Sequence, residues 1–142
     1  MLWCVVMSYS YQEDDSIAFL ISMILTFSGG LCLLYLGRNA DSNMSRRDSY
    51  LVVTATWVTF SVFGMLPYMI GGYITSLTDA YFETMSGFTT TGASIVDDVE
   101  QLPHGILFWR SLSQWIGGLG IVFFTIAILP SMGDGSVRVF AA

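Results

Sequence analysis

The sequence predicts an all-α integral membrane protein, in which one transmembrane helix precedes a helix–re-entrant loop–helix repeat. Apolar residues make up 54% of the 142-residue chain and charged residues only 11%, whereas charged residues form roughly a quarter of an ordinary soluble domain. The mean hydropathy is +0.63. A soluble domain of this size buries only about 68–70% of the surface that its unfolded chain exposes. The lipid bilayer is therefore the expected environment, and the same composition excludes intrinsic disorder.

Three stretches are long and apolar enough to cross a bilayer. Ser16–Gly37 has 22 residues and no charge, which at the helical rise gives about 33 Å, the thickness of a hydrocarbon core. Residues 50–74 are also uncharged, and Pro67 is expected to stop or kink that helix near its end. Residues 105–130 carry only Arg110. Because backbone polar groups in lipid need internal partners, we expect all three stretches to be α-helices.

A different kind of segment lies between the second and third stretches. Residues 75–88 are mixed in polarity, and a helix here would reach only about 18 Å, halfway through the membrane. Ser76 followed by Asp79 is typical of a capping box, and Gly87 lies near the end. The polar turn TTTGAS follows at residues 89–94, and an acidic loop comes next. This pattern predicts a re-entrant pore loop, because non-helical backbone at membrane depth needs protein or a wet cavity around it.

The arginines predict the orientation of the chain. Arg38, Arg46 and Arg47 lie in the link between the first two helices, and Arg138 follows the third. The positive-inside rule places both segments in the cytoplasm. Acidic residues collect on the opposite side, at positions 13–15 and 97–100. A formal charge of −6 without a basic stripe also excludes a nucleic-acid partner.

The TTTGAS turn has the chemistry that a dehydrated cation needs. Backbone carbonyls can replace the ion's water oxygens without adding full charges that would hold it too tightly. Consecutive carbonyls face one ion only in an unusual backbone conformation, which Gly92 can adopt at little cost. Threonine hydroxyls can coordinate the ion or support the chain, and the C-terminal end of the preceding short helix favours a cation. We expect Thr90, Thr91, Gly92 and Ala93 to line the ion path, with Thr89 as support.

Two ionisable residues are expected at membrane depth. Glu83 lies in the short segment, and Arg110 lies near the outer end of the last helix. Because an unpaired charge at that depth is costly, we predict that they form an ion pair that supports the filter without touching the ion. The alternative is that Arg110 alone extends to the membrane surface.

Small residues mark the helices on either side of the loop. Gly117, Gly118 and Gly120 lie on the last helix, and Gly64 lies on the second. Close helix packing is their expected role. A flexible point used in gating is the alternative.

Several motifs resemble one known family. Residues 79–94 read DAYFETMSGFTTTGAS, and residues 102–133 read LPHGILFWRSLSQWIGGLGIVFFTIAILPSMG. These runs are similar to the Trk/Ktr potassium-uptake family, in its TrkH-type branch. The similarity extends to RRDSYLVVTATWVTFSVFGMLPYMIGG and, more weakly, to EDDSIAFLISMILTFSGG. That family has four helix–pore loop–helix repeats in one polypeptide around a central pore, with an extra helix pair in front in TrkH-type members.

The resemblance implies an organisation and a function. Residues 1–45 would be a leading transmembrane helix region with its cytoplasmic link, and residues 46–142 the first helix–pore loop–helix repeat. The implied function is potassium uptake across the inner cell membrane, with K⁺ at Thr90, Thr91 and Gly92. No enzymatic activity and no organic cofactor are expected. The implied partners are the remaining pore repeats, a second copy in a homodimer, and a cytoplasmic nucleotide-binding regulatory subunit.

The chain departs from the family pattern in two respects. Three further repeats and the family's intramembrane gating loop are missing. We therefore expect a section of a longer transporter or a truncated gene product, with a self-assembling tetramer of single repeats as a further alternative. The filter sequence is TTTGAS and not the TVGYG of tetrameric potassium channels, so four-fold symmetry does not follow.

Two other classes of protein stay open on the sequence alone. One is an intramembrane hydrolase with Ser94 as nucleophile, His104 as its base and Asp134 as a protease carboxylate, which requires nucleophile and base within hydrogen-bond reach. The other is a non-conducting membrane interaction subunit, in which the threonine-rich turn is an ordinary loop. Ion flux after reconstitution separates this second class from a transporter.

Overall fold

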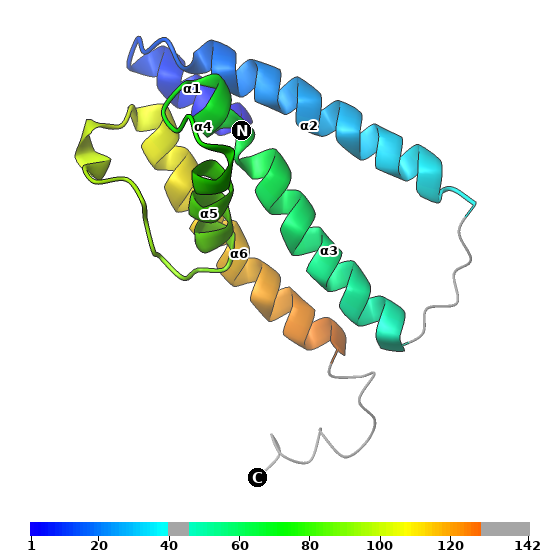
Figure 1. The fold of residues 1–142 in the computed structure, drawn as a ribbon. Helices are drawn as coiled ribbons and strands as arrows, with labels where there is room; N and C mark the ends of the chain where they lie inside the picture. The colour runs from blue at the N-terminus through cyan, green and yellow to red at the C-terminus, as the bar shows by residue number, and fades with distance from the viewer. Residues whose placement is uncertain (40–45, 129–142) are drawn as a thin grey trace.

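Figure 1 shows the fold of the chain as a computed structural model, which describes residues 1–39 and 46–128. All regular structure in these two ranges is helical. The elements in chain order are α1 (Leu2–Ser10), α2 (Ser16–Gly37), α3 (Arg46–Gly64), α4 (Leu66–Ile70), α5 (Leu77–Phe88), the 3-10 helix η1 (Val99–Gln101) and α6 (His104–Ile128). This confirms the predicted all-α class. Arg138 lies outside the described residues.

Three helical stretches could cross a membrane by length and composition, as predicted. They are Ser16–Gly37, Tyr50–Ile70 and His104–Phe123. The second is interrupted between α3 and α4, because Pro67 has no N–H to donate to the carbonyl one turn earlier. The expected end of that helix at residue 74 is wrong. The chain turns after Ile70, where Gly72 adopts a φ of +73° that favours glycine.

The short helix α5 forms as the capping box predicts. The Ser76 side chain accepts a hydrogen bond from the Asp79 amide at 3.4 Å. The helix packs against α3 and α6, and its last residue, Phe88, reaches Gly117 near the middle of α6. The chain then returns along a long loop to the start of α6 (Figure 1). This path is the predicted re-entrant arrangement.

Glycines bring the spanning helices close to α5. A Cβ atom at Gly64 would lie 2.7 Å from the side chains of both Thr84 and Phe88. A Cβ at Gly117 would overlap the Phe88 carbonyl group and lie 2.8 Å from its carbon. Gly120 faces Trp57 of α3, where a Cβ would lie 3.1 Å from the indole ring. Close packing is thus confirmed for these three glycines.

We expect Gly117→Ala to displace the end of α5 and with it the loop that follows. Real Cβ atoms do not approach backbone this closely, and overpacking of this kind typically costs about 1–3 kcal/mol. Gly118→Ala is the matched control, because its Cβ would meet only a methyl group of Thr90 at 4.0 Å. Thermal unfolding of the intact transporter should show a lower midpoint for Gly117→Ala alone. Equal midpoints for the two variants would contradict the contact.

The break between α3 and α4 is supported by α6. The Trp109 indole N–H donates to the Gly64 carbonyl at 3.0 Å. This carbonyl lies at the end of α3, where the helix ladder stops, because the Tyr68 amide donates to Met65 instead at 3.1 Å. Trp109 is buried in the core cluster, to which α1, α2, α4 and α5 also contribute residues. It therefore belongs to the core.

The leading helices are tied to α6 by the link between α1 and α2. The Glu13 carboxylate accepts the backbone N–H of His104 at 3.2 Å and that of Gly105 at 3.5 Å. Its Oε1 also lies 2.8 Å from His104 Nδ1, and the Tyr11 ring stacks on the imidazole with centroids 4.0 Å apart. Residues about 90 positions apart in sequence thus form one contact at the acidic side of the molecule.

The Glu13 contact predicts a pH dependence of stability. Burial alone would raise the pKa of Glu13, but hydrogen bonds from His104 and Gly105 outweigh it and hold the pKa below its ordinary value of 4.5. A lowered pKa in the folded state gives stability that is complete above the ordinary value and is lost as pH falls through the lowered one. The unfolding midpoint of the parent protein should therefore approach that of Glu13→Gln below about pH 4.5. Asp14→Asn, at the exposed neighbouring carboxylate, should show no such convergence.

Candidate ion-binding site

The turn after α5 is built on the C-terminal end of that helix. The amides of Thr89, Thr90 and Thr91 donate to the carbonyls of Met85, Gly87 and Ser86 at 2.9, 3.0 and 3.0 Å. These bonds satisfy helix carbonyls that would otherwise lack partners. They also turn the backbone N–H groups of the loop towards the helix, so the loop is fixed from one side.

Two residues of the turn adopt the left-handed backbone region. Gly92 has a φ of +75°, as its expected role requires, and Thr90 has a φ of +57°. For a β-branched residue this conformation is a genuine outlier, and such strain gathers at functional sites. The sequence indicated Gly92 but gave no sign of the strain at Thr90, since threonine disfavours that region.

The carbonyl groups of the turn divide into two kinds. In the described part of the chain, no donor lies at hydrogen-bond distance from the carbonyls of Thr90, Thr91 and Gly92. The Ala93 carbonyl differs, because it accepts the Ser86 hydroxyl at 2.6 Å and so faces α5. All four residues are exposed on the surface of the repeat. Three neighbouring carbonyls are therefore available to an ion, and Ala93 is held by the short helix.

Threonine hydroxyls stabilise the turn from within. The Thr89 hydroxyl donates to the Met85 carbonyl at 2.8 Å, and its oxygen lies 2.9 Å from that of Thr91. Thr89 is thus engaged in the structure of the loop. No charged side chain occurs within residues 89–94, so any ion here would meet neutral oxygens.

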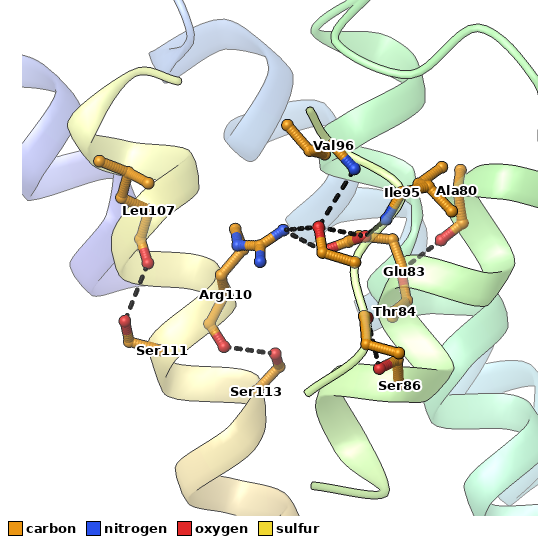
Figure 2. A network of polar contacts seen from close by, with 12 residues as sticks. Ala80, Glu83, Thr84, Ser86, Ile95, Val96, Leu107, Arg110, Ser111 and Ser113 are labelled. Carbon is orange, nitrogen blue, oxygen red and sulfur yellow. Dashed lines mark hydrogen bonds and ion pairs between the residues drawn. The ribbon is translucent and has the colours of Figure 1, made fainter. Parts of the chain in front are cut away.

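Glu83 and Arg110 form the predicted ion pair behind the turn. The Arg110 Nη1 group donates to Glu83 Oε1, and the Glu83 side chain is only 3% exposed (Figure 2). The carboxylate also accepts the Ser94 hydroxyl at 3.1 Å and the Ile95 amide at 3.0 Å. Helix α5, helix α6 and the returning loop therefore meet at one carboxylate.

The polar residues of the returning loop were not predicted as part of this network. The Ser94 oxygen also accepts the Val96 amide at 3.1 Å and lies 3.4 Å from Arg110 Nη1. An exposed serine in a loop carries no periodic signal that would point to such a role. The pair adds no net charge near the turn, because its two charges cancel.

The hydrolase alternative is not favoured by this geometry. The Ser94 hydroxyl donates to Glu83, whereas the imidazole of His104 contacts Glu13 and Tyr11. The two side chains are therefore engaged in separate contacts and do not form a nucleophile and base. Asp134 lies outside the described residues.

Together, the spanning helices, the short helix and the loop with free carbonyls define a membrane protein of the pore-loop class. The family of cation transport proteins called TrkH matches residues 15–141. The chain belongs to the TrkH family.

Several relatives of the chain carry potassium uptake in their names. The chain is 38% identical over 124 residues to the Trk system potassium uptake protein TrkH of Halomonas elongata, covering 87% of the chain and 26% of that protein. It is 35% identical to TrkH of Vibrio parahaemolyticus, covering 93% and 27%, and 33% identical to TrkG of Escherichia coli, covering 99% and 29%. The chain thus spans just over a quarter of the length of these curated relatives. No solved structure gives a significant match.

Proposed function

We propose that the chain takes part in potassium uptake, as one section of a Trk-type transporter in the inner cell membrane. The observation that carries this proposal is the row of free carbonyls at Thr90, Thr91 and Gly92, at the end of a helix that stops near the middle of α6. Membership of a cation transport family supports it, as do relatives named for potassium uptake.

Within this proposal, K⁺ binds to the carbonyl oxygens of Thr90, Thr91 and Gly92. Such oxygens replace part of the hydration shell of the ion, and their number and field strength set the preference for potassium over sodium. The negative end of the α5 dipole adds to the attraction. Ala93 lines the path but directs its carbonyl to Ser86. Thr89, Glu83 and Arg110 hold the loop and do not touch the ion.

One chain of this length supplies only part of the wall around an ion. We therefore propose that residues 46–142 form the first pore repeat, after a leading helix region at residues 1–45, and that further repeats of the same transporter complete the ring. The exposure of residues 90–95 in this single repeat supports the assignment. A homodimer and a cytoplasmic nucleotide-binding regulatory subunit complete the proposed assembly. The transported ion needs no organic cofactor.

The test is ion uptake by the intact transporter that contains this chain, purified and reconstituted into liposomes. We expect potassium to enter down an imposed gradient, and sodium under the same gradient to enter much more slowly. Liposomes without protein give the background leak. Uptake of neither ion above that background would contradict the proposal and favour the non-conducting membrane subunit.

A further inference from the structure

A small polar cavity lies behind the candidate filter, among α4, α5, α6 and the returning loop. Its volume is about 10 Å³, and its walls include Tyr68, Glu83, Ala93, Arg110 and Gln114. A cavity needs roughly 10–15 Å³ to hold one water molecule, together with two to four polar partners. The size of this cavity therefore admits one water molecule and no larger ligand.

Tyr68 is a buried side chain on this cavity whose hydroxyl has no hydrogen-bond partner among the described residues. Its side chain is 2% exposed, and none of the described residues lies at hydrogen-bond distance from its hydroxyl group. A buried tyrosine hydroxyl usually finds a hydrogen-bond partner. Since Tyr68 lines the cavity, that partner can be a molecule within it.

The other walls of the cavity offer both donors and acceptors. Within the described residues, both side-chain hydrogen bonds of Arg110 are donated by Nη1. The N–H groups of its Nη2 and Nε atoms can therefore donate to a molecule in the cavity. The Ala93 carbonyl has a second lone pair beside the one that accepts from Ser86. The lining carries no net charge, because the charges of Glu83 and Arg110 cancel, so it favours an ion of neither sign. Water, which both donates and accepts, fits such a mixed lining.

We propose that this cavity binds a single water molecule that links the Tyr68 hydroxyl to the Glu83–Arg110 network behind the filter. Tyr68 is then a positioning residue, because it acts on the carbonyls of the turn through the water and the returning loop. The shortest connection from the water to the carbonyls of the turn runs through Ala93, which lines the cavity and directly follows Gly92 in the chain. This inference rests on the proposed function of residues 90–92.

Tyr68→Phe tests the proposal, because it removes only the hydroxyl group. Tyr81→Phe is the matched control. It also removes one tyrosine hydroxyl, but Tyr81 lies on α5, is half-buried and does not line the cavity. Both variants are measured in the intact transporter at equal membrane abundance. We expect Tyr68→Phe to lower the preference for potassium over sodium about 3- to 10-fold, the effect of losing one hydrogen bond, and Tyr81→Phe to leave it unchanged. Equal preferences in the two variants would overturn the role of Tyr68.

A direct measurement keeps the proposal falsifiable if Tyr68→Phe folds poorly. An experimental density map of the parent transporter that resolves other buried waters should show one solvent peak within hydrogen-bond distance of the Tyr68 oxygen. Its absence would overturn the water site. If instead a filter substitution such as Gly92→Ser leaves the ion preference unchanged, the proposed function fails. If Gly92→Ser changes that preference and Tyr68→Phe does not, this inference fails alone.

Discussion

Arg110→Gln is expected to destabilise the intact transporter by about 3–5 kcal/mol, the usual cost of removing one partner from a buried ion pair. Glu83 is 4% exposed, so its carboxylate would stay buried without a neutralising charge. The effect reaches beyond the pair, because Glu83 also accepts hydrogen bonds from Ser94 and Ile95 of the returning loop. Loss of Arg110 is therefore also expected to weaken the hydrogen bonds that hold the segment after the candidate filter to Glu83.

A double-mutant cycle separates the pairing from the two individual effects. Glu83→Gln should also destabilise, but Glu83→Gln with Arg110→Gln should cost less than the sum, because the double variant buries no uncompensated charge. Unfolding midpoints in detergent measure all four proteins. Arg47→Gln is the control, since that arginine is exposed and surface changes usually alter stability by less than about 0.5 kcal/mol. Strict additivity of the two changes would contradict the ion pair.

The elements that the sequence predicted correctly share one physical cause, which is the cost of unpaired polar groups in lipid. The bounds of α2 follow from an uncharged run that ends where polar residues begin, and the break near Pro67 follows from its missing N–H. The Glu83–Arg110 pair was predictable for the same reason, because both charges lie in segments that the sequence places in the membrane, where an unpaired charge is costly. The start of α5 was predicted from a local signal instead, because Ser76 and Asp79 have the spacing of a helix cap.

The missed features depend on contacts between residues that are distant in sequence or on backbone angles. The contact between Glu13 and His104 joins two exposed polar segments, whose pairing no local pattern encodes. The bond from Ser86 to the Ala93 carbonyl depends on how the loop folds back on α5, so the direction of this carbonyl could not be predicted from the sequence. The left-handed conformation of Thr90 runs against the preference of its residue type. Sequence patterns therefore located the loop but could not orient its carbonyls.

Gly92→Ser is expected to weaken the preference of the intact transporter for potassium over sodium. The φ of Gly92 is +75°, and none of the described residues lies within 4 Å of a Cβ atom at this position. The penalty therefore comes from the backbone, because a side chain in the left-handed region costs about 1–2 kcal/mol. Relaxation of that strain would turn the carbonyls of Thr91 and Gly92 and so change the ligand number and field around the ion. A change of this size corresponds to about a 5- to 30-fold loss of discrimination.

Gly72→Ser is a close structural control for this substitution. Gly72 has a φ of +73° and equally open surroundings, but it lies in the turn after α4 and not in the candidate filter. Both variants should therefore lose similar stability, while only Gly92→Ser should change ion preference. Potassium-limited growth rescue and sodium competition, compared at equal membrane abundance, measure that preference. If the two variants discriminate between the ions as well as the parent does, residues 90–92 are not the selectivity filter, because a ring of carbonyls that sets ion preference cannot tolerate a rotation within it.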